Sequence, residues 1–283
     1  YLIRKNFPLA EKYLIKLIQL SKENVKKIIP LILGYTYEGN EKQYKKICKL
    51  FIKNLTRDSS KFSLNLKKNK LPKISFLSPD IRNHPVGFFI KDMLPELSKA
   101  FEVIIFNTSE FEDEISIYTK KLCQWINLKD KNEYEIADII YKKNVDVLID
   151  TSGMTRTNNL GVFKLKPSKN QISWAGWLAS TNLKEMDYVI SDNFCTPKKD
   201  EKFFTEKILR MKNIWCTYSL SVLENLNLKK ENNSEPFIIY GCFQRPEKIT
   251  KKVLIGFGVI AGLLFGVLYM IFTQGTFFYG EIN

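Results

Sequence analysis

Histidine is nearly absent from this sequence, since His84 is the only one among its 283 residues. A hydrolytic triad would therefore have to use His84, and no GxSxG motif marks a nucleophile for it. The five cysteines contain no CxxC pair and lie far from His84 in sequence, so we expect no metal site. Their odd number and wide spacing predict reduced, mostly buried thiols in a cytosolic compartment.

Common motifs for binding nucleotides are also missing. There is no DxD motif, which argues against a metal-dependent nucleotide-sugar site, and no GxxxxGK[ST] or convincing GxGxxG loop. The formal charge is +14, but the lysines are scattered through every segment instead of gathering with aromatic residues. We therefore expect no nucleic-acid partner. An anionic small molecule and an acidic membrane surface fit the charge equally well.

Residues 1–57 have the periodicity of helices. Apolar residues recur at helical spacing over 9–20, 24–38 and 41–53, and Gly39 and Asn40 predict the end of the second helix. Short helices of this size resemble tetratricopeptide-type units, and a helical cap on the next domain is an equal alternative. This region is a candidate for binding a partner. A polar, lysine-rich linker, 58–71, follows it.

From residue 72 onward, strand and helix signals alternate, which predicts an open α/β sheet. Two of the strand signals are nearly all apolar, the pattern of parallel strands that are buried on both faces. The expected strands are 73–78, 102–106, 146–150, 171–174, 187–191, 207–211 and 236–241, and the expected helices are 86–99, 112–122, 132–143 and 158–164.

His84 lies in the turn between the first expected strand and the helix after it. Ligands of doubly wound folds bind at the carboxyl ends of strands, close to helix N-termini. The ordinary pKa of imidazole, about 6.5, suits proton transfer near neutrality. The structural alternative is a loop histidine that caps the helix or bonds a backbone carbonyl.

Three further clusters follow expected strands. The hydroxyl-rich turn 150–155 can present backbone N–H groups to an anion or a sugar, or provide ordinary turn and capping chemistry. Segment 173–182 carries two tryptophans, which suit a sugar platform and a core equally well. Segment 242–249 contains Lys248, which could neutralise a phosphate, although one lysine in a lysine-rich chain is weak evidence.

Residues 253–272 form a run of 20 without charge. As a helix this run would span about 30 Å, the thickness of the hydrocarbon core of a bilayer. Gly258, Gly262 and Gly266 form a small-xxx-small pattern, and lysines only precede the run. We expect a membrane-spanning helix here, with the N-terminal part in the cytoplasm and 273–283 as a tail. A buried soluble helix is the alternative.

In this order, the clusters resemble the catalytic region of the O-linked N-acetylglucosamine transferase family, which also carries tetratricopeptide repeats. The resemblance covers about residues 72–250, and the helical residues 1–57 lie where the family has its repeats. The stretches that carry it are ISFLSPDIRNHPVGFF (74–89), FEVIIFNTS (101–109), DVLIDTSGMTRTNNLGVFKLKPSKNQISWAGW (146–177), MDYVISDNFCTP (186–197) and CFQRPEKIT (242–250).

The resemblance implies a GT-B architecture, in which two Rossmann-like domains enclose the active site. It implies transfer of N-acetylglucosamine from UDP-GlcNAc to serine or threonine of proteins, with no metal and no cofactor. His84 matches the family's active-site histidine, described as a base or an acceptor-side contact, and Lys248 matches the lysine on the donor diphosphate. Asn182 ends a loop near the donor, and Pro85 and Thr155 are candidates for acceptor or loop contacts.

The sequence departs from the family in three places. The loop 176–182 lacks a proline and two glycines, Met154 stands where many bacterial members have histidine, and the family pattern stops just after Lys248. The sequence therefore predicts an α/β chain with one Rossmann-like open sheet, the first half of a GT-B fold. A tetratricopeptide-like helical segment precedes it and one transmembrane-type helix follows. The expected protein is an incomplete transferase, weakly active or inactive. The alternative is a non-catalytic, membrane-tethered scaffold or protein-binding module.

Overall fold

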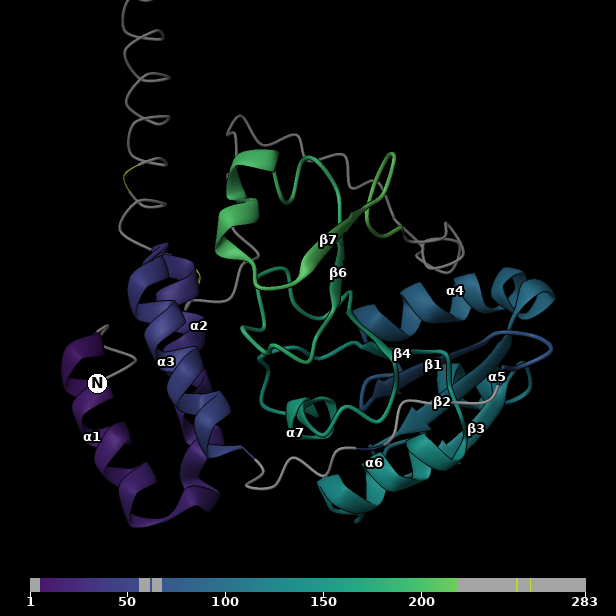
Figure 1. The fold of residues 1–283 in the computed structure, drawn as a ribbon, viewed down its shortest axis with the longest axis horizontal. Coiled ribbons are helices and arrows are strands. Elements are labelled where there is room, and N and C mark those ends of the chain that lie inside the picture. The colour runs from purple at the N-terminus through teal and green to yellow at the C-terminus, as the bar shows by residue number, and fades with distance from the viewer. Residues whose placement is uncertain (1–5, 56–61, 63–67, 218–247, 249–254, 256–283) are drawn as a thin grey trace, which may run out of the picture. The chain divides into compact units, whose positions relative to one another are not determined.

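The computed structural model describes residues 6–55, 62, 68–217, 248 and 255 (Figure 1). The chain divides into two compact units. The first contains residues 1–36 and 40–231, and the second contains residues 37–39 and 232–283. All the strands described below belong to the first unit.

The N-terminal part is helical. Helix α1 (Phe7–Leu20) begins after Asn6, whose side chain accepts the Leu9 N–H. Gly39, with a φ of +66°, follows helix α2 (Ile29–Glu38). This helix therefore ends where the Gly39-Asn40 signal predicted. Asn40 then caps helix α3 (Glu41–Asn54). Between α1 and α2 the chain forms a 3-10 helix over Lys22–Ile28 instead of the α-helix that periodicity suggested.

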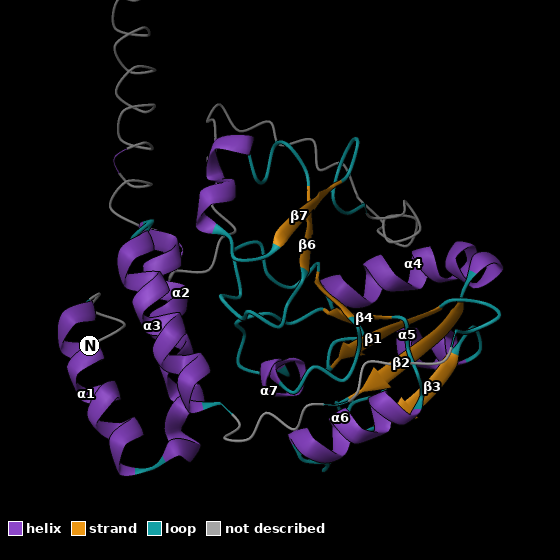
Figure 2. Cartoon of the chain, viewed as in Figure 1, coloured by secondary structure: helices purple, strands orange, loops and turns teal. Residues whose placement is uncertain are grey.

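Seven parallel strands form one sheet in the order β3-β2-β1-β4-β5-β6-β7 (Figure 2). The order reverses between β1 and β4, which makes this pair the topological switch point of the sheet. Six of these strands were expected from the sequence, whereas the short, half-exposed edge strand β3 was not. The expected strand 236–241 lies outside the described residues. The strands are β1 (Lys73–Ser78), β2 (Glu102–Asn107), β3 (Gln124–Asn127), β4 (Val147–Asp150), β5 (Asn170–Ser173), β6 (Tyr188–Ser191) and β7 (Lys207–Arg210).

Helices cover both faces of the sheet. In β1, Phe76 packs in one hydrophobic cluster and Leu77 in the other, because neighbouring residues of a strand point to opposite faces. Figure 2 shows α4 on one face and α6 on the other, and Ile90 and Ile140 accordingly belong to different clusters. The helices are α4 (Pro85–Ala100), α5 (Glu114–Lys120), α6 (Glu133–Lys142) and α7 (Leu160–Lys164), with a 3-10 helix at Lys198–Phe203.

The N-terminal helices share a core with the sheet. Phe51 of α3 is fully buried in the same cluster as Leu148 of β4 and Phe163 of α7. At the end of α3 the Lys164 ammonium donates to the Ile52 carbonyl at 2.8 Å, where a helix leaves carbonyls without intrahelical partners. The helices and the sheet are therefore packed as one unit.

The expected transmembrane helix is not part of this fold, and the fold prediction was wrong on that point. No helix within the described ranges combines the length and the apolar character that a bilayer span requires. The longest, α4, has 16 residues and includes charged ones, whereas a span needs about 20 apolar residues. The segment 253–272 lies outside the described residues except for Ile255. The described chain is an α/β sheet preceded by helices.

Candidate functional site

Polar residues end the strands on both sides of the switch point. Ser78 ends β1, Asp150 ends β4 and Ser173 ends β5, and all three are buried. Because the strands are parallel, the segments that follow them emerge at the same edge of the sheet. These segments are the turn 79–84 with His84, the loop 151–159 and the loop 174–187. This edge is the place where ligands of doubly wound folds bind.

His84 caps α4 through one of its ring nitrogens. Its half-buried side chain accepts the Val86 N–H at Nδ1, over 3.3 Å, so the capping alternative from the sequence is the arrangement observed. A ring nitrogen that accepts a hydrogen bond carries no proton, so this geometry assigns the proton of the neutral ring to Nε2. Nε2 is then a donor, and using it as a base would require a tautomer exchange that breaks the cap.

The His84 turn is held from two directions. Asp113, which caps α5, accepts the Asn83 N–H at 2.5 Å. Although burial raises the pKa of Asp113, backbone hydrogen bonds from Asn83, Ser116 and Ile115 outweigh it and place that pKa below its ordinary value. A Cβ atom on Gly87 would lie 2.0 Å from the Arg82 carbonyl oxygen, so only glycine lets α4 approach the turn so closely.

The loop after β4 is organised by Asp150. This fully buried carboxylate accepts the Ser152 N–H at 3.0 Å and the Gly153 N–H at 2.8 Å. Burial raises the pKa of Asp150 to about 6 and outweighs the opposing effect of these two bonds. Gly153 has a φ of +51°, and a Cβ there would lie 2.1 Å from Cβ of Trp177. The loop therefore packs directly on the loop after β5.

The loop after β5 ends at Asn182, which has a φ of +55°. Asparagine tolerates this left-handed conformation better than most residues, which accounts for one of the missing glycines. Gly176 remains because a Cβ there would lie 1.9 Å from the Thr151 carbonyl oxygen. The Asn182 Nδ2 donates to the Ser180 carbonyl at 3.3 Å, and its buried Oδ1 has no hydrogen-bond partner among the described residues.

Buried polar atoms without partners gather on these two loops. Across the described ranges, nine buried side-chain atoms lack a hydrogen-bond partner, and five of them lie at the ends of β4 and β5 or just beyond. An unsatisfied buried polar group costs about 1–3 kcal/mol, so such a concentration is typical of a place that water or a polar ligand completes. The five are Thr151 Oγ1, Ser152 Oγ, Thr155 Oγ1, Ser173 Oγ and Asn182 Oδ1.

Comparison with protein families shows to which family the chain belongs. Residues 30–229, more than half of the chain, match the family described as Glycosyl transferase family 41. The chain belongs to this family.

Curated members of glycosyl transferase family 41 are similar to the chain over part of their length. The probable UDP-N-acetylglucosamine–peptide N-acetylglucosaminyltransferase SPINDLY of Arabidopsis thaliana is 28% identical over 200 residues, which cover 67% of this chain and 22% of that protein. The UDP-N-acetylglucosamine–peptide N-acetylglucosaminyltransferase of Caenorhabditis elegans is 24% identical over 144 residues, 49% of this chain and 12% of that protein. The chain therefore spans less than a quarter of either relative.

A solved structure supports the fold. A mutant of the O-GlcNAc transferase of Thermobaculum terrenum superposes with a TM-score of 0.54 at 16% identity, covering 75% of this chain and 48% of the other. The recognised family and the Rossmann-like parallel sheet are thus both confirmed.

The family resemblance selected five site residues, and the structure places three of them, His84, Thr155 and Asn182, on segments that emerge at one edge of the sheet. Pro85 is exposed at the first position of α4. Lys248 belongs to the second unit, where its ammonium lies 5.9 Å from the centre of the Tyr37 ring. That unit is described by itself, so Lys248 is not built into the site.

The sequence also singled out Met154 and the cysteines, and the structure shows where they lie. Met154 is fully buried in the hydrophobic core. The four described cysteines are free thiols, with Cys48 buried and Cys195 exposed. In the part of the chain that the structure describes, no group of three or more histidine, cysteine or acidic residues could hold a metal ion.

Sequence reasoning missed three residues that support the family site: Tyr44, Asp113 and Glu206. Asp113 did carry a local signal, because an aspartate three residues before Ser116 is a capping-box pattern. Its bond to Asn83, 30 residues away, had no sequence signal. Tyr44 and Glu206 had no sequence signal either, because each contacts a loop that is distant from it in the sequence.

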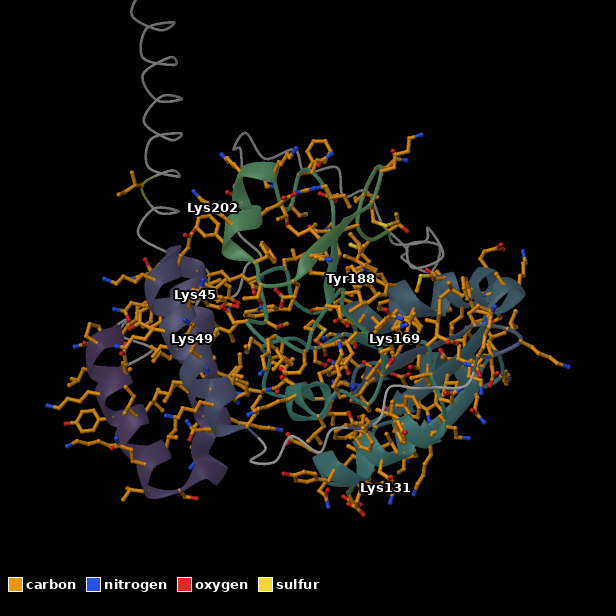
Figure 3. All side chains as sticks on the ribbon, in the orientation of Figure 1. Lys45, Lys49, Lys131, Lys169, Tyr188 and Lys202 are labelled. Atoms are coloured by element: carbon orange, nitrogen blue, oxygen red, sulfur yellow. The ribbon has the colours of Figure 1, made fainter. Side chains whose placement is uncertain are left out.

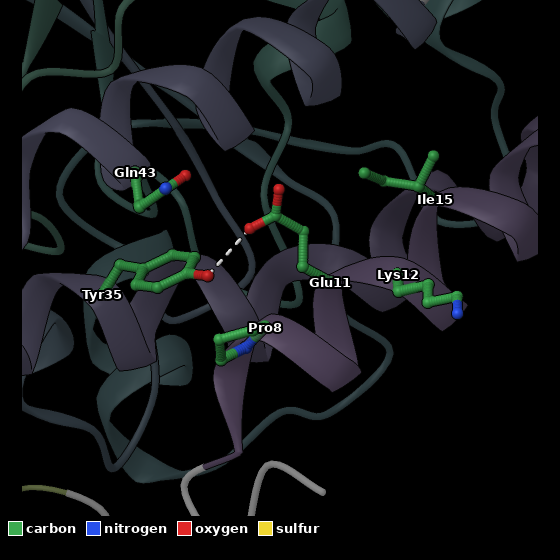
Figure 4. Close-up of a pocket in the computed structure, with 6 residues that line it drawn as sticks. All are labelled: Pro8, Glu11, Lys12, Ile15, Tyr35 and Gln43. Atoms are coloured by element: carbon green, nitrogen blue, oxygen red, sulfur yellow. Dashed lines mark hydrogen bonds between the residues drawn. The ribbon is translucent and has the colours of Figure 1, made fainter.

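The lysines of the described residues are spread over several parts of the fold. Of the lysines labelled in Figure 3, Lys45 and Lys49 lie on α3, Lys202 lies in the 3-10 helix Lys198–Phe203, and Lys131 and Lys169 lie in loops. A cavity of about 280 Å³ is formed within the N-terminal helices (Figure 4). There the Glu11 carboxylate already accepts the Tyr35 hydroxyl at 2.8 Å and the Lys46 ammonium at 2.5 Å. The cavity is lined by Pro8, Glu11, Lys12, Ile15, Tyr35 and Gln43.

Proposed function

We propose that this chain contributes one wall of a glycosyltransferase active site. In the reaction, N-acetylglucosamine passes from UDP-GlcNAc to a serine or threonine hydroxyl of a protein. The C1–O bond to the diphosphate breaks and a bond from C1 to the hydroxyl oxygen forms, which releases UDP and a proton. The observation that supports the proposal is that His84 and the five unpartnered polar atoms lie at strand ends, or on segments that follow them, along one edge of the sheet of a family 41 chain.

His84 acts in this proposal as a hydrogen-bond donor. Its Nδ1 accepts the Val86 N–H, so the neutral ring carries its proton on Nε2, the atom that would donate to an oxygen of donor or acceptor. The adjoining N-terminus of α4 favours negative charge, as a departing diphosphate develops. For Lys248, which belongs to the second unit, the resemblance implies a contact with a donor diphosphate. Pro85 would border the acceptor.

In this proposal Asn182 supplies a polar contact to the donor, and Thr155 supplies a contact to the acceptor or within the loop. The Thr155 hydroxyl can donate and accept, whereas Asn182 Oδ1 can only accept. We expect weak turnover or none from the chain by itself, because its described residues form one Rossmann-like sheet and the resemblance implies two. A chain that neither bound nor transferred the nucleotide sugar would favour the alternative of a non-catalytic scaffold or protein-binding module, without its membrane tether.

The first test uses His84→Asn and His84→Ala. Asparagine is a strong N-cap, so His84→Asn removes the imidazole while keeping α4 capped, and alanine removes both. Isotope-labelled UDP-GlcNAc and a serine-containing peptide are supplied to each protein, and a nucleotide sugar with another base is the specificity control. We expect His84→Asn to lower any transfer by about 100-fold or more with little change in Tm. Transfer at the wild-type rate in His84→Asn would show that the imidazole takes no part in the reaction.

A second measurement reports binding even where turnover is absent. Because the chain has one histidine, its imidazole resonances need no assignment. The ¹⁵N shifts should show the Nε2–H tautomer, and UDP-GlcNAc should move these resonances. If saturating UDP-GlcNAc left both the resonances and the peptide unchanged, the proposed function would be wrong for this chain.

A further inference from the structure

The loop that ends at Asn182 is bound to helix α3 by a buried tyrosine. The Tyr44 hydroxyl donates to the Ser180 carbonyl and accepts the Trp177 indole N–H, which lies 3.2 Å away. Tyr44 is buried, and burial raises its pKa well above the ordinary value. The phenol therefore keeps its proton, and with it the bond to Ser180, over the whole physiological pH range.

A buried carboxylate holds the same loop from the other side. Glu206, just before β7, is only 5% exposed. Its Oε2 accepts the Ser180 hydroxyl at 2.6 Å, and its Oε1 accepts the Thr181 N–H at 2.7 Å and also the Thr181 hydroxyl. Three donors from two consecutive loop residues thus converge on one side chain, which fixes the backbone where it is bound.

These bonds extend to Asn182 through Ser180. The Asn182 N–H donates to the Ser180 hydroxyl at 3.0 Å, and Nδ2 donates to the Ser180 carbonyl at 3.3 Å. Both Ser180 oxygens are the atoms that Tyr44 and Glu206 hold. The left-handed backbone of Asn182 and the placement of its unpartnered Oδ1 therefore depend on two residues far away in sequence.

We propose that Tyr44 and Glu206 are positioning residues for Asn182, and that they hold its Oδ1 ready to accept a hydroxyl or N–H of the sugar donor. The second half of this statement rests on the proposed function. The N-terminal helices are accordingly part of the support of the donor site. Side-chain anchors hold the loop that lacks the proline and glycines of the family, and a binding partner that displaced α3 would loosen it.

Tyr44→Phe tests the anchor, and Tyr35→Phe is its matched control. Tyr35 is also buried in the helical part and donates to a side chain, Glu11, but it does not contact the loop. Tyr44→Phe loses both bonds of the hydroxyl, and the loss of the bond to the Ser180 carbonyl should speed amide exchange at Thr181, Asn182 and Leu183 by about tenfold. Tyr35→Phe should leave these amides unchanged. The Trp177 indole signal, one of four, should shift only in Tyr44→Phe.

Glu206→Gln and Glu206→Ala test the second anchor. Glutamine keeps one acceptor oxygen, so exchange at Thr181 and Asn182 should rise less in Glu206→Gln than in Glu206→Ala. If exchange in the loop were unchanged in Tyr44→Phe and in both Glu206 variants, the positioning role would be overturned. This result does not depend on whether the chain binds a nucleotide sugar.

A double-mutant cycle tests the link to the donor. In a chain that binds UDP-GlcNAc, Tyr44→Phe and Asn182→Ala should each raise its Kd, and the double variant should raise it no further than Asn182→Ala alone. The Kd of the acceptor peptide should not change. Additive effects, or an unchanged Kd in Tyr44→Phe, would overturn the donor role. Failure of the wild-type chain to bind UDP-GlcNAc would instead count against the proposed function.

Discussion

The imidazole of His84 has a structural role through Nδ1, and this limits the chemistry open to Nε2. A proton added to Nδ1 would remove the lone pair that accepts the Val86 N–H, and with it the cap of α4. Protonation and tautomer exchange therefore both act on the helix as well as on the site. A histidine bound in this way is better suited to donating a fixed hydrogen bond than to cycling a proton.

At the residue scale, Asp150 gives the fold a distinct pH dependence. Burial raises its pKa from the ordinary 3.8 to about 6. Between these values the folded chain binds more protons than the unfolded chain, so the contribution of Asp150 to the free energy of unfolding falls as the pH rises from about 4 to about 6, and it stays low above that. The size of the fall is about 3 kcal/mol.

Urea unfolding of wild type and Asp150→Asn across this pH range measures the effect. The asparagine side chain does not titrate. The free energy of unfolding of wild type minus that of Asp150→Asn should therefore fall by about 3 kcal/mol as the pH rises from about 4 to about 6. Asp138→Asn is the control, because the Asp138 side chain on α6 is 45% exposed. A difference curve that is flat from pH 4 to 7 would show that Asp150 is not desolvated in the folded chain.

At the element scale, the approach of α4 to the His84 turn depends on Gly87. In an exposed helix, replacing glycine with alanine stabilises by about 1 kcal/mol. At Gly87, however, the new Cβ would lie 2.0 Å from the Arg82 carbonyl oxygen and 2.7 Å from its nitrogen. Backbone atoms cannot rotate away as a side chain can. The steric cost should therefore exceed the gain in helix propensity.

We expect Gly87→Ala to lower the free energy of unfolding by about 1–3 kcal/mol and to shift the His84 resonances. Gly34→Ala in α2 is the matched control. Its Cβ would meet only the end of the Phe7 ring, at 2.8 Å, which can move aside. Gly34→Ala should be neutral or stabilising by up to about 1 kcal/mol. Equal effects of the two substitutions in urea unfolding would refute the close approach at Gly87.

At the scale of the whole molecule, the helices and the sheet share one core and should unfold together. Phe51 of α3 is fully buried in that core. Phe51→Ala should lower the free energy of unfolding by about 3–5 kcal/mol. All four tryptophans, from Trp125 to Trp215, lie outside the helical part, so their fluorescence reports on the α/β part. The lower stability of Phe51→Ala should nevertheless lower the unfolding midpoint that tryptophan fluorescence reports.

The control for Phe51→Ala is Leu20→Ala, because Leu20 is 83% exposed and its removal should cost less than about 0.5 kcal/mol. Circular dichroism, dominated by helices, should give the same midpoint as fluorescence. An unchanged fluorescence midpoint in Phe51→Ala would show that the helices fold separately from the sheet.

The sequence predicted most elements because their signals are local. Alternation and apolar runs placed β1, β2 and β4 to within about one residue, and the Gly39-Asn40 stop was confirmed. β3 was missed because a strand of four half-exposed residues at a sheet edge has no pattern that sets it apart. The transmembrane helix was predicted from composition alone, and the described helices do not support it.

The sequence by itself determined the family and the candidates His84, Thr155 and Asn182, because motif order and strand ends can be read along the chain. Tertiary structure alone decided how these residues are held. Asp113 holds the His84 turn, and Tyr44 and Glu206 hold the loop of Asn182, through bonds that join residues from 25 to 136 positions apart. Such pairs leave no trace in local pattern, since they form only when the parallel sheet and the shared core bring distant segments together.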